Sequence, residues 1–114
     1  MQNLNKGVLL GQIAKGQQLA GATIPLFEPQ WFYKYLVIRV GVDAAGANPT
    51  SGGDCNTFLI PSGNTIFLGG WHIFNTLKGQ LRLSIDDNQI RIASNAGHVP
   101  TENLGIAIYG IEKI

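Results

Sequence analysis

Short apolar segments dominate this sequence, and Gly, Pro or Asn residues interrupt them at intervals of about ten residues. In some segments, such as Leu81–Ile85, apolar and polar residues alternate, whereas in Tyr33–Val40 the apolar residues continue almost unbroken. Alternation with period two places apolar side chains on one face of a strand, and frequent turn residues keep such strands short. No segment has the pattern of a helix longer than one turn. This pattern is typical of a β-sandwich or a β-barrel, and we expect an all-β fold, an antiparallel β-sandwich.

The turn residues also predict where the strands begin and end. We expect about eight strands in one domain covering residues 1–114, a length that can bury a core without disulfides or a metal. The expected strands are Gly7–Ile13, Gln17–Leu26, Tyr33–Val42, Asn56–Ile60, Thr65–Leu68, Gly79–Ile85, Gln89–Ala93 and Leu104–Glu112. A Greek-key jelly roll and a simpler sandwich share these signals, so the strand order stays open.

Two segments are too apolar to lie at the surface. Tyr33–Val40 has apolar side chains at most positions, whereas a surface strand would present a polar face, so it should lie centrally in a sheet. Leu104–Ile114 is similarly apolar. We expect it to be buried, either centrally in the domain's own sheet or against copies of the chain.

A hairpin is predicted where the arms Leu81–Ile85 and Ile90–Ile92 flank a polar turn. Both arms alternate, so one face of the hairpin should be solvated. Asp87 and Asn88 are residue types that adopt the positive φ values of a tight turn. Together with Asp86 they lack the spacing and the closing Glu of a calcium loop, and we interpret them as turn residues.

Composition excludes several classes of partner. Eight Lys and Arg against seven Asp and Glu give a formal charge of +1, without the basic excess that binding to nucleic acid requires. Charged residues make up only 13% of the chain, which favours association with other subunits. The single cysteine, Cys55, is expected to be a small buried thiol. No secretory signal and no apolar run long enough for membrane insertion is present, so a soluble chain is expected.

Catalytic motifs are absent from the sequence. The histidines, His72 and His98, belong to no zinc-binding motif, and there is no Gly-x-Ser-x-Gly nucleophile elbow. Asp54 and Glu102 could act as a glycosidase pair only if their loops were neighbours, which nothing in the sequence requires. We therefore predict that the protein is not an enzyme, uses no cofactor and has no recognisable metal-binding residues, while metal binding by one of the loops stays open.

Three polar or aromatic segments are candidates for ligand binding: the long loops Asp43–Asp54 and Ser94–Asn103, and the segment Gly69–Thr76. Long loops on a rigid sandwich commonly carry binding residues, and an exposed Trp offers a flat face to a sugar ring. The candidate ligand-binding residues are Asp43, Asn48, Thr50, Asp54, Trp71, His72, Asn95, His98 and Glu102. The alternatives are that the loops are solvated connections and that the Trp plugs one end of the sandwich. The rings of Trp31 and Phe32 could cap the core, pack on a neighbouring subunit or stack on a sugar.

Several segments resemble the C-terminal β-sandwich domains of bacteriophage tail fibres and receptor-binding proteins. They are Gly21–Leu26, the strand Tyr33–Val40, the hairpin arm Gly79–Ile85 and the terminal Ile108–Ile111. The resemblance implies a homotrimeric, jelly-roll-like head in the virion tail, which binds a bacterial surface polysaccharide or protein receptor during host attachment without cleaving it. It also implies that Leu104, Ile106, Ile108 and Ile111 lie in the core and that Trp31 or Phe32 lies near the trimer axis.

A second function stays open at this point. The same sandwich would serve as a structural virion subunit of a capsid, baseplate or fibre, with other virion proteins as its partners and no ligand of its own. The two hypotheses differ in the fate of the polar loops, because an assembly subunit buries them and a receptor-binding domain leaves them free.

Overall fold

The computed structural model describes residues 7–13, 18–42, 54–62, 70–76, 79–94 and 104–114. Within these residues the chain forms two antiparallel sheets of four strands each, and one 3-10 turn, η1 (Gln30–Phe32). The strands are β1 (Val8–Ile13), β2 (Thr23–Pro25), β3 (Tyr33–Val42), β4 (Asp54–Pro61), β5 (Trp71–Thr76), β6 (Gly79–Ile85), β7 (Gln89–Ile92) and β8 (Gly105–Lys113). The predicted all-β sandwich of about eight strands is confirmed.

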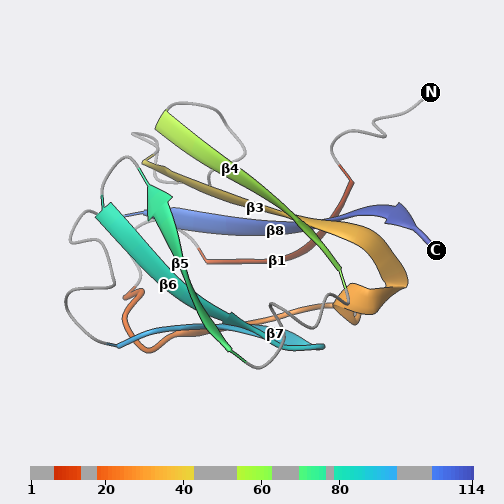
Figure 1. Ribbon diagram of the computed structural model, residues 1–114, viewed down its shortest axis with the longest axis horizontal. Coiled ribbons are helices and arrows are strands. Elements are labelled where there is room, and N and C mark those ends of the chain that lie inside the picture. The colour runs from red at the N-terminus through yellow and green to blue at the C-terminus, as the bar shows by residue number, and fades with distance from the viewer. Residues whose placement is uncertain (1–6, 14–17, 43–53, 63–69, 77–78, 95–103) are drawn as a thin grey trace.

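The strand order, which the sequence left open, is β1-β8-β3-β4 in the first sheet and β2-β7-β6-β5 in the second. Figure 1 shows β8 between β1 and β3, with the second sheet facing this layer. The pairing of β1 with β8 and of β2 with β7 gives the fold its jelly-roll-like character, and a β3–β4 hairpin and a β5–β6–β7 meander complete the sheets. The central position predicted for the strand beginning at Tyr33 is confirmed, and of the two alternatives for the C-terminal segment the structure shows the central one, because β3 and β8 each have neighbours on both sides.

The core lies between the sheets and follows the predicted alternation. In β3 every second side chain, at Leu36, Ile38 and Val40, is buried, and Leu81 and Leu83 of β6 face them from the second sheet. Burial of each such side chain stabilises the fold by roughly 1.5–3 kcal/mol. The sandwich core thus comes mainly from the alternating arms of its central strands.

Contacts between edge strands close the two sides of the sandwich. At one side Phe58 of β4 meets Phe74 of β5 edge to face, with ring centroids 5.1 Å apart. At the other side the amide of Phe27 donates a hydrogen bond of 2.8 Å to the carbonyl of Leu10. Gly11 allows this approach, because a Cβ atom there would lie 2.6 Å from the carbonyl oxygen of Pro25.

Tyr33, the first residue of β3, has the largest fully buried side chain among the described residues. Its ring packs on Gly110, where a Cβ atom would lie 2.5 Å from the ring carbon Cγ. Its hydroxyl donates a hydrogen bond to Glu28, which also pairs with Lys113 at 3.2 Å. Burial and this carboxylate raise the pKa of Tyr33 to about 12, and the bond from Tyr33 lowers the pKa of Glu28.

Two of the predicted strands differ from the structure. In the described part of the expected strand Gln17–Leu26, residues 18–26, only Thr23–Pro25 forms a strand, because a turn with Gly21 at φ 75° precedes it and the amide of Ala22 donates to the carbonyl of Leu19. The expected strand Thr65–Leu68 lies outside the described residues. The structure has a strand at Trp71–Thr76, where no strand was predicted.

The β6–β7 hairpin is confirmed, but its turn has a different conformation. Neither Asp87 nor Asn88 has a positive φ; among the described non-glycine residues only Glu112 does, at 58°. The turn is held from outside, since the amides of Leu26 and Gln30 donate to the carbonyls of Asn88 and Asp87 at 2.8 and 2.9 Å. These contacts add to the turn's own hydrogen bond, in which the amide of Asp86 donates to the carbonyl of Gln89 at 2.9 Å.

Some single-residue predictions are corrected by the register. Ile111 does not lie in the core, because it pairs with Tyr35 on the outer face of the first sheet, an odd number of positions from the buried Ile108. Leu104 and Ile106 are buried as expected. The backbone of Cys55 lies in β4, but its side chain is outside the description, so the buried thiol stays a prediction. No helix in the described part of the chain has the length and apolarity needed to cross a membrane.

Candidate functional site

The outer face of the second sheet carries the most distinctive side chains of the described chain. The register aligns Trp71 of β5 with Ser84 of β6, and Ser84 with Arg91 of β7. In the next row Ile73 lies opposite Arg82. Paired residues on neighbouring strands point to the same face, so an indole and two guanidinium groups meet on one surface.

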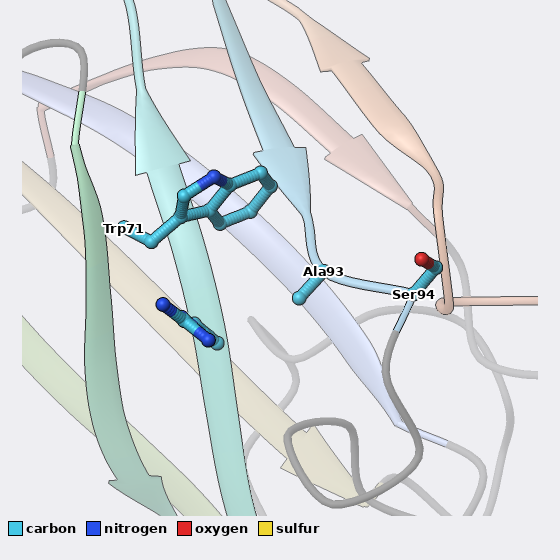
Figure 2. A pocket seen from close by; sticks show the side chains of 4 residues that line it. Trp71, Ala93 and Ser94 are labelled. Atoms are coloured by element: carbon cyan, nitrogen blue, oxygen red, sulfur yellow. The ribbon is translucent and has the colours of Figure 1, made fainter.

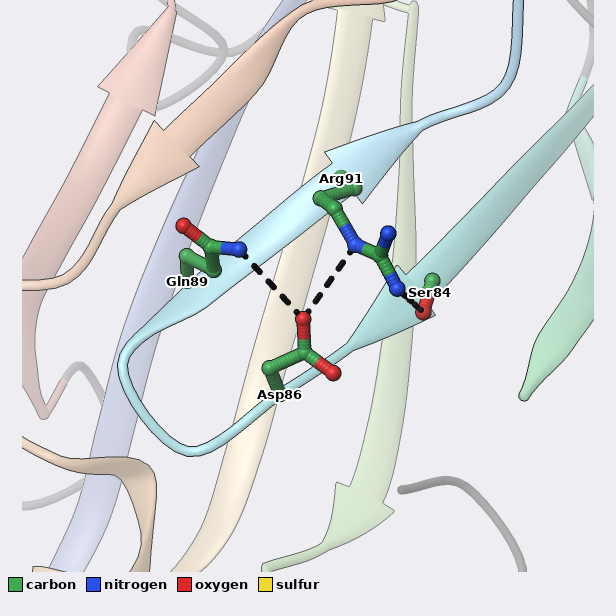
Figure 3. Close-up of polar contacts among 4 residues, drawn as sticks. All are labelled: Ser84, Asp86, Gln89 and Arg91. Atoms are coloured by element: carbon green, nitrogen blue, oxygen red, sulfur yellow. Dashed lines mark hydrogen bonds and ion pairs between the residues drawn. The ribbon is translucent and has the colours of Figure 1, made fainter. Parts of the chain in front are cut away.

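Arg91 is held in place by three contacts. Its Nε lies 3.2 Å from Oδ2 of Asp86 as an ion pair, and its Nη2 donates a hydrogen bond of 3.1 Å to Oγ of Ser84. Figure 3 shows Asp86 between Arg91 and Gln89, whose Nε2 lies 3.5 Å from the same carboxylate oxygen. The guanidinium carbon of Arg91 also lies 5.3 Å from the ring centroid of Trp71, a cation–π distance.

This arrangement corrects the prediction of a simply solvated hairpin face. Ser84 points outward, yet it is fully buried. Ala93, at the end of β7, is also buried. The small side chains form the bottom of a depression on this face, and the longer cationic and aromatic side chains form its sides.

A pocket of about 220 Å³ lies on this face, lined by Trp71, Arg82, Ala93 and Ser94. Figure 2 shows the indole of Trp71 extending toward Ala93 and Ser94. The volume is below the range of 300–1,000 Å³ that is typical for drug-sized ligands, and it suits a single sugar residue or a small polar group. Trp71 remains 41% exposed, so part of its ring is available to a ligand.

The two arginines differ in how their charges are compensated. Arg91 has a carboxylate partner, whereas Arg82 forms no ion pair with any described residue. The Nε of Arg82 is buried and has no hydrogen-bond partner among the described residues. Arg82 therefore brings to the pocket wall a cation that has no carboxylate partner among the described residues.

The structure separates the two predicted residues of the Gly69–Thr76 segment. Trp71 lies on the outer face, and its neighbour His72 pairs with the buried Leu83 on the inner side of the sheet. Adjacent residues of a strand point to opposite faces, so His72 does not orient a ligand that stacks on Trp71.

The remaining predicted residues cannot be compared with this site. The backbone of Asp54 begins β4 at the edge of the first sheet, and its side chain is outside the description. The other predicted residues lie outside the described residues: Asp43, Asn48, Thr50, Asn95, His98 and Glu102. Ser94, the first residue of the second long loop, does line the pocket.

Sequence reasoning missed Arg82, Ser84 and Arg91. They occupy the polar positions of an alternating hairpin, a pattern that also describes an ordinary solvated face. Two arginines at the outward positions of facing arms were the available signal, but their proximity to Trp71 depends on the strand register.

A second aromatic surface lies at the C-terminal end of β8. Trp31, Phe32, Lys113 and Ile114 line a pocket of about 310 Å³. Trp31 is 52% exposed and meets Phe32 edge to face at 4.7 Å, and Phe32 packs against the core. Phe32 thus caps the core as one of the predicted alternatives. The cation here is compensated, because Lys113 pairs with Glu28 at 3.2 Å.

No group of three or more His, Cys, Asp or Glu side chains in the described ranges is placed to hold a metal ion. Comparisons of the chain with models of protein families, with curated proteins and with solved structures give no match. The outer face of the second sheet is therefore the basis for the function proposed below.

Proposed function

We propose that this chain is a non-enzymatic saccharide-binding domain whose binding site is the outer face of the second sheet around Trp71. The observation that carries the proposal is a part-exposed indole beside a pocket of about 220 Å³ on a rigid sheet. An aromatic ring packs against the apolar face of a pyranose, and the neighbouring Arg and Ser side chains provide hydrogen-bonding groups for its hydroxyls.

The resemblance to tail-fibre tip domains supports a biological setting for this activity. In that setting the domain recognises a glycan on the bacterial surface during attachment of a phage, and the cell-bound sugar is left intact. A shallow pocket that holds one sugar residue gives modest affinity. Several copies on one particle raise the avidity, because each further site binds at a high effective concentration.

A second candidate function, assembly into a virion structure, is favoured by the outer face of the first sheet. There the register places Leu9, Tyr109, Val37 and Leu59 in one row across all four strands. Leu59 is 62% exposed. An apolar row of this kind suits contact with another subunit, including the further copies of a homotrimer.

Binding to bacterial cells and to immobilised surface polysaccharides tests the first proposal. Trp71→Ala should abolish retention of the domain, and Trp31→Ala, which removes the other tryptophan, should leave it unchanged. Retention of Trp71→Ala at the level of the parent chain would reject the site. Failure of the parent chain to bind any cell or polysaccharide would favour the assembly function.

A further inference from the structure

The charge on the Trp71 face is unbalanced at one position. Of the two arginines there, Arg91 is neutralised by Asp86, and that carboxylate is also contacted by Gln89. Arg82 has neither an ion pair nor a hydrogen bond to its buried Nε within the described part of the chain. Among the described residues that line the pocket, Arg82 is therefore a cation without a counter-charge.

A buried donor without a partner is unfavourable, since it has lost its bonds to water. A bound anion would give the guanidinium group the counter-charge that the described residues do not supply. The guanidinium group is planar and presents its N–H groups in a fork that matches the two oxygens of a carboxylate or phosphate. Arg91 cannot serve in the same way, because Asp86 already compensates its charge and its Nη2 donates to Ser84.

We infer that the site selects saccharides that carry an anionic substituent, a carboxylate or a phosphate, which Arg82 binds while the sugar ring packs on Trp71. This inference rests on the proposed saccharide binding. Trp71 and Arg82 line the same pocket, so one ligand residue can reach both. The pocket volume of about 220 Å³ limits recognition to a single acidic sugar residue within a longer glycan.

The experiment compares matched saccharides by nuclear magnetic resonance titration of the labelled domain. The probes are the methyl glycosides of glucose, galactose and mannose, the corresponding uronic acids, and the 6-phosphates of the same sugars. The uronic acids and the phosphates form separate arms, so the titration distinguishes the two sources of negative charge. We expect at least one acidic sugar to bind about ten to a hundred times more tightly than its neutral counterpart, as for charge-assisted hydrogen bonds.

In Arg82→Gln the ratio of the affinities for acidic and neutral sugars should fall to about one, and the neutral sugars should still bind weakly. The matched control is Arg39→Gln, which removes one half-buried arginine from β3 in the other sheet and should leave the preference intact. Arg82→Lys keeps the charge but lacks the fork, and it should keep only part of the preference.

The possible failures separate the two proposals. If neutral sugars bind with shifts centred on Trp71 and acidic sugars bind no better, the anionic preference is wrong and saccharide binding stands. If acidic preference persists in Arg82→Gln, the assignment to Arg82 is overturned. If none of the nine probes gives a saturable shift, saccharide binding at this site is rejected, and the preference with it.

Discussion

The guanidinium of Arg91 lies over the indole of Trp71, with its carbon 5.3 Å from the ring centroid, while its nitrogens contact Asp86 and Ser84. The side chain thus links β5, β6 and the hairpin turn. The guanidinium group covers part of the indole of Trp71, the residue that the proposed ligand contacts. The orientation of Trp71 should therefore depend on the planar shape of Arg91 as well as on its charge.

Arg91→Lys tests this dependence. Lysine keeps the positive charge but cannot contact the carboxylate, the hydroxyl and the ring together, and we expect the free energy of unfolding to fall by about 1 kcal/mol. The emission of Trp71 should also change in a Trp31→Phe background, where it is the remaining tryptophan. Urea denaturation and fluorescence spectra measure both effects; unchanged stability together with an unchanged spectrum would contradict the described contacts.

The raised pKa of Tyr33 predicts that the folded domain loses stability at high pH. Its pKa is raised to about 12 in the folded chain from an ordinary value near 10, so the folded state binds this proton more tightly than the unfolded state. The stabilisation is fully present below pH 10 and is lost as the pH rises through 12, by an amount on the order of 2 kcal/mol.

Urea denaturation between pH 9 and pH 12 measures this loss, and Tyr33→Phe provides the control because it lacks the titrating hydroxyl. The difference in stability between the parent chain and this variant should shrink across that range. A difference that is constant with pH would show that Tyr33 does not titrate as described.

Gly110→Ala should destabilise the domain, because the added Cβ would lie 2.5 Å from Cγ of the buried Tyr33 ring. Overpacking of this kind costs about 1–3 kcal/mol. The cost should be smaller in a Tyr33→Leu background, where the ring is absent, and a double-mutant cycle of urea denaturation measures the coupling. Equal costs in the two backgrounds would place the strain elsewhere.

The apolar row on the first sheet predicts self-association. Light scattering at several concentrations should give three copies of the 12.3 kDa chain, about 37 kDa, if this face forms the homotrimer. Leu59→Lys should shift the mass to that of the monomer, whereas Ile73→Lys, an exposed apolar residue on the opposite sheet, should not. A strict monomer for the parent chain would be the result that excludes this interface.

Much of the fold was predictable from local patterns. The bounds of Tyr33–Val42 and Gly79–Ile85 agree with the predicted strands because their hydrophobicity and alternation are properties of one segment. Strand β5 was missed because its apolar residues face both ways: Trp71 and Ile73 point outward and Phe74 inward. Such a strand shows no alternation, and only its pairing with β6 reveals it.

The candidate site was predictable only in part. An exposed Trp71 was one predicted alternative, since the sequence around it suggested an aromatic platform. Its pairing with Ser84, and the pairing of Ser84 with Arg91, depend on the register of three strands. Register is a long-range property that the turn sequence alone did not specify here, because contacts from Leu26 and Gln30 hold that turn.

The most direct test of the proposed function is a fluorescence titration of the Trp31→Phe variant with bacterial surface polysaccharides and with the nine sugars described above. Trp71 is then the reporter at the proposed site, and we expect a saturable change in its emission that Arg82→Gln weakens for acidic ligands. Binding detected on the same polysaccharides by a label-free method, without any change in Trp71 emission, would contradict the assignment of the site to this face.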